Sequence, residues 1–161
     1  MKIVLANDHV GLAMKQDIAT FIQDLGHEII DIGTHSSNKA EYPIYGRMAA
    51  EAVASGEADR AILICGTGFG IALAANTVTG IRCVNCTEPY TATLSRQHNN
   101  ANALALGARV VGVERAKMIV ELWLKTDFDT TNIRHAARVD MLVAMKACPA
   151  PGTYALEAKC E

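Results

Sequence analysis

The chain carries a cysteine at the start of a glycine-rich turn, in the stretch ILICGTGFGIALAAN at residues 62–76. An apolar run ends at Cys65, and Gly66, Gly68 and Gly70 follow before a helix-forming segment. Glycines in such a bend let backbone N–H groups approach a ligand closely, and the start of a helix favours negative charge there. The same surroundings favour the thiolate form of a cysteine. The pattern predicts an anion site, in which Cys65 is a base, a nucleophile or an ordinary buried residue.

The order of the glycines differs from both common nucleotide-binding loops. After Gly66 and Gly68 the next glycine is Gly70, and position 71 is isoleucine, so the GxGxxG pattern is absent. The Gly-Lys-Ser/Thr sequence of a P-loop does not follow either. A small anion, or a negative charge that develops during a reaction, is therefore the expected ligand.

Other polar residues lie where they could join this turn. Asp8 and His9 follow the first apolar run, where Asn-Asp could equally begin a turn or cap a helix. The segment QHNNAN, residues 97–102, lies between a helix and a strand and is either functional or a polar cap. Arg134 and Arg138 are four residues apart, so on a helix they share one face. There they could clamp a phosphate or form an exposed basic face.

The cysteines favour neither a disulfide framework nor a metal site. There are five of them, an odd number at irregular spacing, which is typical of reduced thiols. Cys83 and Cys86 form a CxxC, but no second pair follows at zinc-ligand spacing. Because they lie in a predicted strand, side chains three residues apart point to opposite faces. We expect both to be structural and the protein to hold no metal.

The composition indicates one globular domain. The chain has 161 residues, half of them hydrophobic, with a formal net charge of -2 and no basic run that could follow a nucleic-acid backbone. The start, MKIVLANDHVG, becomes polar too soon for a signal peptide, and no apolar stretch reaches the roughly 18 residues of a membrane span. Nucleic acid and membranes are not expected partners, and the expected location is the cytoplasm.

Predicted strands alternate with predicted helices along the chain. The strands are expected at residues 2–6, 27–32, 61–65, 81–85 and 103–106, and the helices at 12–25, 43–56, 70–77, 88–98 and 116–125. This order predicts an α/β three-layer Rossmann-like sandwich with a five-stranded parallel sheet. Ligands bind such sheets beyond the carboxyl ends of the strands, which places Asp8 and Cys65 along one rim. The domain is expected to span residues 1–146, with a C-terminal tail at 147–161.

Five stretches together closely resemble the type B ribose-5-phosphate isomerases: NDHVG, EYP, ILICGTGFGIALAAN, SRQHNNANALALGARVVG and RHAARV. The superfamily also includes galactose-6-phosphate and allose-6-phosphate isomerases. The similarity covers residues 1–146 in unbroken order. It implies interconversion of ribose 5-phosphate and ribulose 5-phosphate through a cis-enediolate, without a metal or an organic cofactor. It also implies a homodimer or homotetramer whose active sites draw residues from two subunits.

The resemblance implies a role for each matching residue. Cys65 would be the base, Asp8 would shuttle the hydroxyl proton and His98 would help to open the sugar ring. Thr67 and the backbone amides of the turn would hold the enediolate oxygens, as stabilisation of such an oxyanion requires. The glycines of the turn are Gly66, Gly68 and Gly70. The implied phosphate and sugar contacts are His9, Tyr42, Asn99, Arg109, Arg134 and Arg138.

Two segments depart from the family pattern, so the identity of the sugar substrate stays undecided. The link DFDTTNIRHAARV is longer than the family's GGRHQRRV, and the tail from about Ala147 is atypical. YPIYGR is similar to the galactose-6-phosphate branch, whereas CTEPY and LSRQHN are similar to the ribose enzymes. The alternatives are an isomerase of allose 6-phosphate, galactose 6-phosphate or a tetrose phosphate, and a non-catalytic anion-binding or thiol-sensing α/β module.

Overall fold

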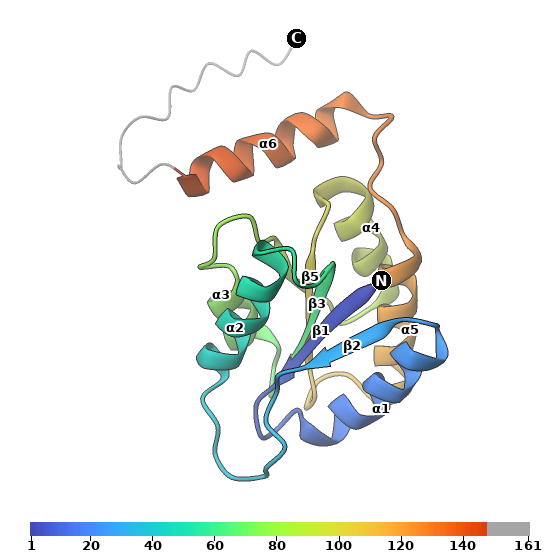
Figure 1. Cartoon of the computed structure of the whole chain (residues 1–161). Helices are drawn as coiled ribbons and strands as arrows, with labels where there is room; N and C mark the ends of the chain where they lie inside the picture. The colour runs from blue at the N-terminus through green and yellow to red at the C-terminus, as the bar shows by residue number, and fades with distance from the viewer. Residues whose placement is uncertain (148–161) are drawn as a thin grey trace.

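A single parallel sheet organises the molecule (Figure 1). The computed structural model describes residues 1–147. The strands lie in the order β2-β1-β3-β5-β4, and every neighbouring pair is parallel. Their bounds are β1 Lys2–Asn7, β2 Glu28–Asp31, β3 Arg60–Cys65, β4 Cys83–Asn85 and β5 Ala103–Gly107. This confirms the three-layer Rossmann-like sandwich with five parallel strands.

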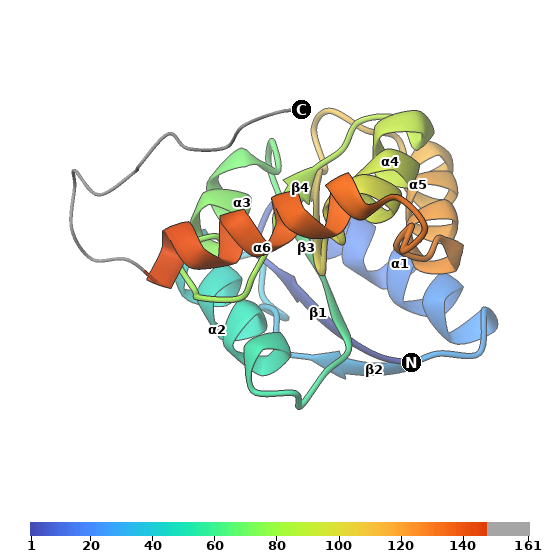
Figure 2. The same cartoon turned by 90° about the horizontal axis from the view of Figure 1, so that it is seen from above.

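Helices cover both faces of the sheet, and one helix lies across its edge (Figures 1 and 2). The helices are α1 Leu12–Asp24, α2 Tyr42–Ala54, α3 Phe69–Ala75, α4 Pro89–Asn99, α5 Val113–Lys125 and α6 Ile133–Ala147. Helices α1, α4 and α5 pack on one face and α2 and α3 on the other. Helix α6 lies across the edge at which the strands begin. Within residues 1–147, none of these helices is both long and apolar enough to cross a bilayer.

Strand alternation decides which face each buried side chain occupies. In β3, Ile62 and Ile64 pack toward α1, α4 and α5, whereas Ala61, Leu63 and Cys65 point to the α2 and α3 layer. Small residues let that second layer come close to the strands and its helices approach each other. A Cβ placed on Gly46 of α2 would lie 2.7 Å from the carbonyl oxygen of Ile71 in α3. Cys65 therefore sits under the tightly packed α2–α3 pair.

The expected element bounds agree with the structure to within two residues, apart from the start of α5, which lies three residues earlier. The shifted starts of β4 and α5 have identifiable causes. Strand β4 begins at Cys83 rather than at residue 81, because the Ile81 N–H donates to Val78 in a turn at 3.3 Å and the Arg82 N–H donates to the Asn102 side chain at 2.8 Å. Helix α5 begins at Val113 rather than at residue 116, because the Gly112 carbonyl already accepts the N–H of Ala116 at 2.9 Å. Side-chain competition and a glycine cap thus set these boundaries.

The CxxC pair is divided between the two cores, as strand alternation predicts. Cys83 belongs to the core under α2 and α3, and Cys86 belongs to the core under α1, α4 and α5. Both residues are buried, and burial raises the pKa of Cys86, which keeps it protonated at neutral pH. Among residues 1–147, no group of three or more His, Cys, Asp or Glu side chains could hold a metal ion. The expected tail at 147–161 lies outside the described residues, apart from its first position.

Candidate active site at the carboxyl edge of the sheet

Cys65 is the last residue of strand β3, and the turn that follows the strand encloses its thiol. Its residue is 4% exposed, and the Gly68 N–H donates to its Sγ at 3.2 Å. Gly68 has a φ of +83°, a left-handed conformation that favours glycine, and a side chain there would also collide with Asn85. The turn therefore aims an amide at the sulfur, where it can stabilise negative charge.

The loops after β4 and β5 hold this turn in place. The carbonyls of Cys65 and Gly66 accept N–H groups from Ala108 and Arg109 at 2.8 and 3.0 Å. The Asn85 side chain at the end of β4 donates to the Thr67 carbonyl at 3.2 Å, while Thr67 itself is exposed. The structure thus brings Arg109 beside the turn and presents Thr67 to solvent, where a substrate could reach it.

Asp8 and His9 lie on the other side of Cys65, at the end of β1. The Asp8 N–H donates to the carbonyl of Ile64 at 3.1 Å, which fixes the start of the Asp8 loop next to the cysteine. Oδ1 of Asp8 accepts the N–H groups of Val10 and Gly11 at 2.9 and 3.1 Å, so the Asx turn is present. These bonds orient the carboxylate and leave Oδ2 as the oxygen that can act on a substrate.

Tyr42 is positioned against the far side of the glycine turn. It begins α2, and its ring lies over Gly70, since a Cβ on that glycine would be 2.6 Å from Tyr42 Cε2. The glycine therefore serves a close approach between the turn and the tyrosine, in addition to any contact with substrate. Asp8, His9, Tyr42, Arg109 and the turn form one cluster at the carboxyl edge of the sheet.

Two other expected site residues, His98 and Asn99, lie near the opposite edge. Helix α4 returns from the carboxyl end of β4 and ends at Asn99, just before β5 begins. The Asn102 carbonyl accepts the N–H of Ala61 at 3.0 Å, and from Ala61 to Cys65 the strand rises about 13 Å. His98 packs against His135 of α6, with ring centroids 4.3 Å apart. Within one chain, these residues therefore lie on the amino-edge side of the sheet, away from the cysteine.

The remaining expected phosphate contacts, Arg134 and Arg138, are both exposed on α6. They share one helical face, as their spacing predicts, and α6 lies across the amino edge (Figure 2). The structure groups them with α4 and His98 rather than with Cys65. Two asparagines of QHNNAN have structural roles. Asn100 ends α4 in a left-handed conformation with φ +47°, and Asn102 bonds Gly80 and Arg82 through its side chain.

The sequence matches the model of the Ribose/Galactose Isomerase family over residues 3–142. The chain belongs to this family. It is 51% identical to ribose-5-phosphate isomerase B of Escherichia coli over 145 residues, which cover 90% of this chain and 96% of the relative. It is 41% identical to D-erythrulose-4-phosphate isomerase 2 of Mycolicibacterium smegmatis, over 89% of this chain and 96% of the relative.

A solved structure of Clostridium thermocellum ribose-5-phosphate isomerase B superposes with a TM-score of 0.89 and 50% sequence identity, over 91% of this chain and 98% of that one. The protein is thus an enzyme of the type B ribose-5-phosphate isomerase family. The expectation of a non-catalytic anion-binding or thiol-sensing module loses its support, since its similar relatives are isomerases. The roles of the individual site residues stay predictions.

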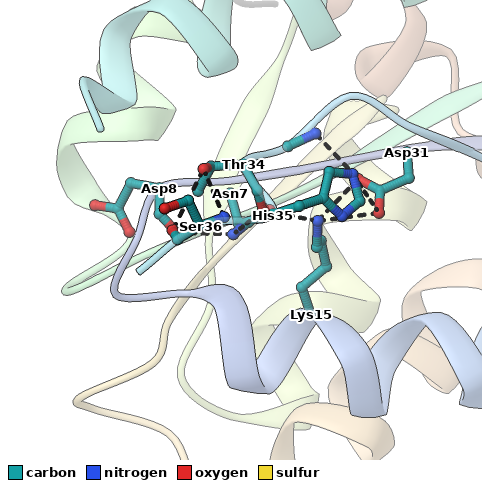
Figure 3. A network of polar contacts seen from close by, with 8 residues as sticks. Asn7, Asp8, Lys15, Asp31, Thr34, His35 and Ser36 are labelled. Carbon is teal, nitrogen blue, oxygen red and sulfur yellow. Dashed lines mark hydrogen bonds and ion pairs between the residues drawn. The ribbon is translucent and has the colours of Figure 1, made fainter. Parts of the chain in front are cut away.

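Sequence reasoning missed several polar residues that shape this isomerase site. Asn85 follows the same rule as Asp8, a polar residue at the carboxyl end of a strand, and could have been singled out on that ground. Its buried Oδ1 has no hydrogen-bond partner among the described residues. A polar network of Asn7, Lys15, Asp31 and Thr34 lies beside Asp8 (Figure 3). Only the structure could reveal it, because its members are distant in sequence.

Proposed function

We propose that the protein interconverts ribose 5-phosphate and ribulose 5-phosphate, with Cys65 as the base. The observation that supports this is the placement of a buried sulfur beside the Gly68 amide, between Asp8 and the Thr67 turn. A proton next to a carbonyl is weakly acidic, so its removal needs a positioned base and donors aimed at the developing oxyanion. At this edge of the sheet, Cys65 would be the base and the amides of the glycine turn would be the donors.

The proposed reaction moves one proton between two carbons. The Cys65 thiolate takes the proton from C2 of the open-chain aldose, and the C2–H electrons form the C1=C2 bond of a cis-enediolate, with the negative charge on O1. Thr67 and the amides of Gly66, Gly68 and Gly70 stabilise this oxygen. Asp8 carries the O2 proton to O1, and the cysteine returns its proton to C1, which leaves a carbonyl at C2. The cycle consumes no cofactor.

We also propose a homodimer, alone or paired into a tetramer, in which each site is completed by the partner subunit. His98, Asn99, Arg134 and Arg138 are needed by the proposed chemistry but lie away from Cys65 in their own chain. Apolar surface supports the same arrangement. Phe69 and Leu73 of α3 are 65% and 71% exposed, and α6 exposes Leu142, Val143 and Met145. Such patches are typical of protein interfaces.

The sugar is tested by a panel of substrates. Purified enzyme is expected to show a kcat/KM for ribose 5-phosphate at least about tenfold above those for erythrose 4-phosphate, allose 6-phosphate and galactose 6-phosphate. Relatives of this family carry different sugar names, including D-erythrulose 4-phosphate, so the panel separates real alternatives. A higher kcat/KM for any other sugar would replace ribose 5-phosphate in the proposal.

The phosphate clamp is tested on α6. Arg138→Ala is expected to raise KM for ribose 5-phosphate by about tenfold to a hundredfold and to change kcat little, because one charged hydrogen bond to the phosphate is lost. Steady-state kinetics measures both constants. Arg115→Ala removes another exposed arginine, on α5, and serves as the matched control with unchanged KM. An unchanged KM in Arg138→Ala would place the phosphate elsewhere.

A further inference from the structure

A buried lysine on α1 makes an ion pair that the proposed reaction does not use. Lys15 is 2% exposed, and its Nζ lies 3.0 Å from both carboxylate oxygens of Asp31 and 3.0 Å from the Thr34 carbonyl (Figure 3). Removing an ion from water is costly, and buried ion pairs are often no more stable than apolar replacements of similar size. Stabilisation of the fold therefore does not by itself explain why this ion pair is buried.

The partners of Lys15 lie at the end of β2 and in the loop that follows it. Asp31 also accepts the N–H of Gly33 at 3.0 Å, which folds the chain back after the strand. The Thr34 carbonyl accepts a second donor, Nδ2 of Asn7, at 3.3 Å, and that amide also bonds the Asp8 carbonyl at 2.7 Å. Lys15 and Asn7 thus bind the start of this loop to the end of β1, which Asp8 and His9 follow.

The far end of the same loop holds the ring of His9. The Ala40 N–H donates to His9 Nδ1 at 3.2 Å. A ring nitrogen that accepts a hydrogen bond carries no proton, so the hydrogen of the neutral ring is on Nε2. His9 then presents an N–H donor at Nε2, which is the group that a phosphate oxygen can accept.

We infer that the Lys15–Asp31 pair is a positioning device for His9. It holds residues 32–41 so that the Ala40 amide selects the Nε2–H tautomer and directs that donor to the substrate phosphate. One part of the inference rests on the proposed function, namely that the ligand of His9 is the phosphate of the substrate. The selection of the tautomer concerns the free enzyme and is measurable without any sugar.

The test replaces Lys15 by methionine, which keeps the length of the side chain and removes the charge. Two-bond ¹H–¹⁵N correlation spectra of protein labelled at histidine report the tautomer, and the signal of His9 is assigned by its loss in His9→Asn. We expect a single Nε2–H tautomer in the wild type and a mixture in Lys15→Met. KM for ribose 5-phosphate should rise about tenfold, as for one weakened hydrogen bond to a charged group, with kcat within about twofold.

Ile18→Ala is the matched control, because Ile18 is fully buried on the same helix and belongs to the apolar core rather than to the network. It should lower Tm and leave both the His9 tautomer and KM unchanged. Should Lys15→Met fail to fold, Asp31→Asn at the 30% exposed partner replaces it with the same readouts.

Three results would overturn the inference: a single His9 tautomer that persists in the network variant, a KM that does not move, or equal changes in Ile18→Ala. A wild-type enzyme that ignores ribose 5-phosphate would instead remove the proposed substrate. The tautomer comparison would stand in that case, because it is made on the free protein.

Discussion

Cys65→Ala is expected to lower kcat for ribose 5-phosphate isomerisation by about a thousandfold, within the usual contribution of a general base. KM should change little, because the sulfur acts on a C–H bond and the phosphate contacts lie elsewhere in the site. The loss is specific to the base position. Cys65 accepts the Gly68 N–H at 3.2 Å and ends the strand beside Asp8, so no other sulfur can replace it.

The decisive measurement is exchange of hydrogen with the solvent. In deuterium oxide, the wild type should place deuterium at C1 or C2 of the sugar, and Cys65→Ala should not, while still binding ribose 5-phosphate in calorimetry. Cys83→Ala removes another buried thiol of the same core and should keep wild-type exchange. Cys65→Ser retains an acceptor for the Gly68 amide and separates loss of the base from loss of packing. Wild-type exchange in Cys65→Ala and Cys65→Ser would leave the thiol without a catalytic role.

The fold was predictable from the sequence because hydrophobic periodicity indicates which segments form strands and which form helices. Apolar runs such as AILIC, bounded by polar residues and alternating with helical patterns, leave few topologies once crossovers are right-handed. The start of β4, by contrast, was decided by a contact between distant residues. Arg82 looks like part of an apolar strand, but its N–H is taken by Asn102, twenty positions later in the chain. Sequence periodicity contains no signal for such competition.

The site was predictable where it follows from one strand end and one turn. Cys65 and the three glycines were expected from the strand-turn-helix pattern, and Asp8 from the rule for carboxyl ends, whereas Thr67 was expected only from the family resemblance. Lys15 could not be placed in the same way. On the apolar side of α1, near Met14 and Ile18, a lysine reads as an exposed residue whose stem packs on the core. Its partners, Asp31 and Thr34, become neighbours only when β2 pairs with β1.

Parallel topology also explains why the proposed site needs two chains. A helix that follows a parallel strand must return to the amino edge before the next strand begins, so a residue at the end of α4 cannot lie beside a residue at the end of β3. His98 and Cys65 are separated by this rule within one subunit. If both act on one sugar, the second subunit must supply one of them.

This requirement predicts complementation between two inactive enzymes. Cys65→Ala and His98→Asn should each be strongly impaired, but co-expressed or refolded together they should regain about a quarter of wild-type activity. Half of the dimers in an equal mixture are hybrids, and each hybrid has one site with both mutations and one with none. The measurement is kcat of the mixture after native mass spectrometry has shown that hybrids are present.

The matched control for complementation is a mixture of Cys65→Ala with Asp8→Asn. Both residues lie at the carboxyl edge and are linked through neighbouring backbone bonds, so they belong to the same half of a site. Each site of that hybrid contains one defect, and the mixture should stay inactive. Recovery in this control would mean that Asp8 and Cys65 of one site come from different subunits, contrary to their shared place at the carboxyl edge. No recovery in the Cys65→Ala and His98→Asn mixture, despite abundant hybrids, would mean that sites are built within single subunits. In that event, His98 would lie too far from the cysteine to open the ring of the sugar bound there, and its role would pass to a residue of the carboxyl edge.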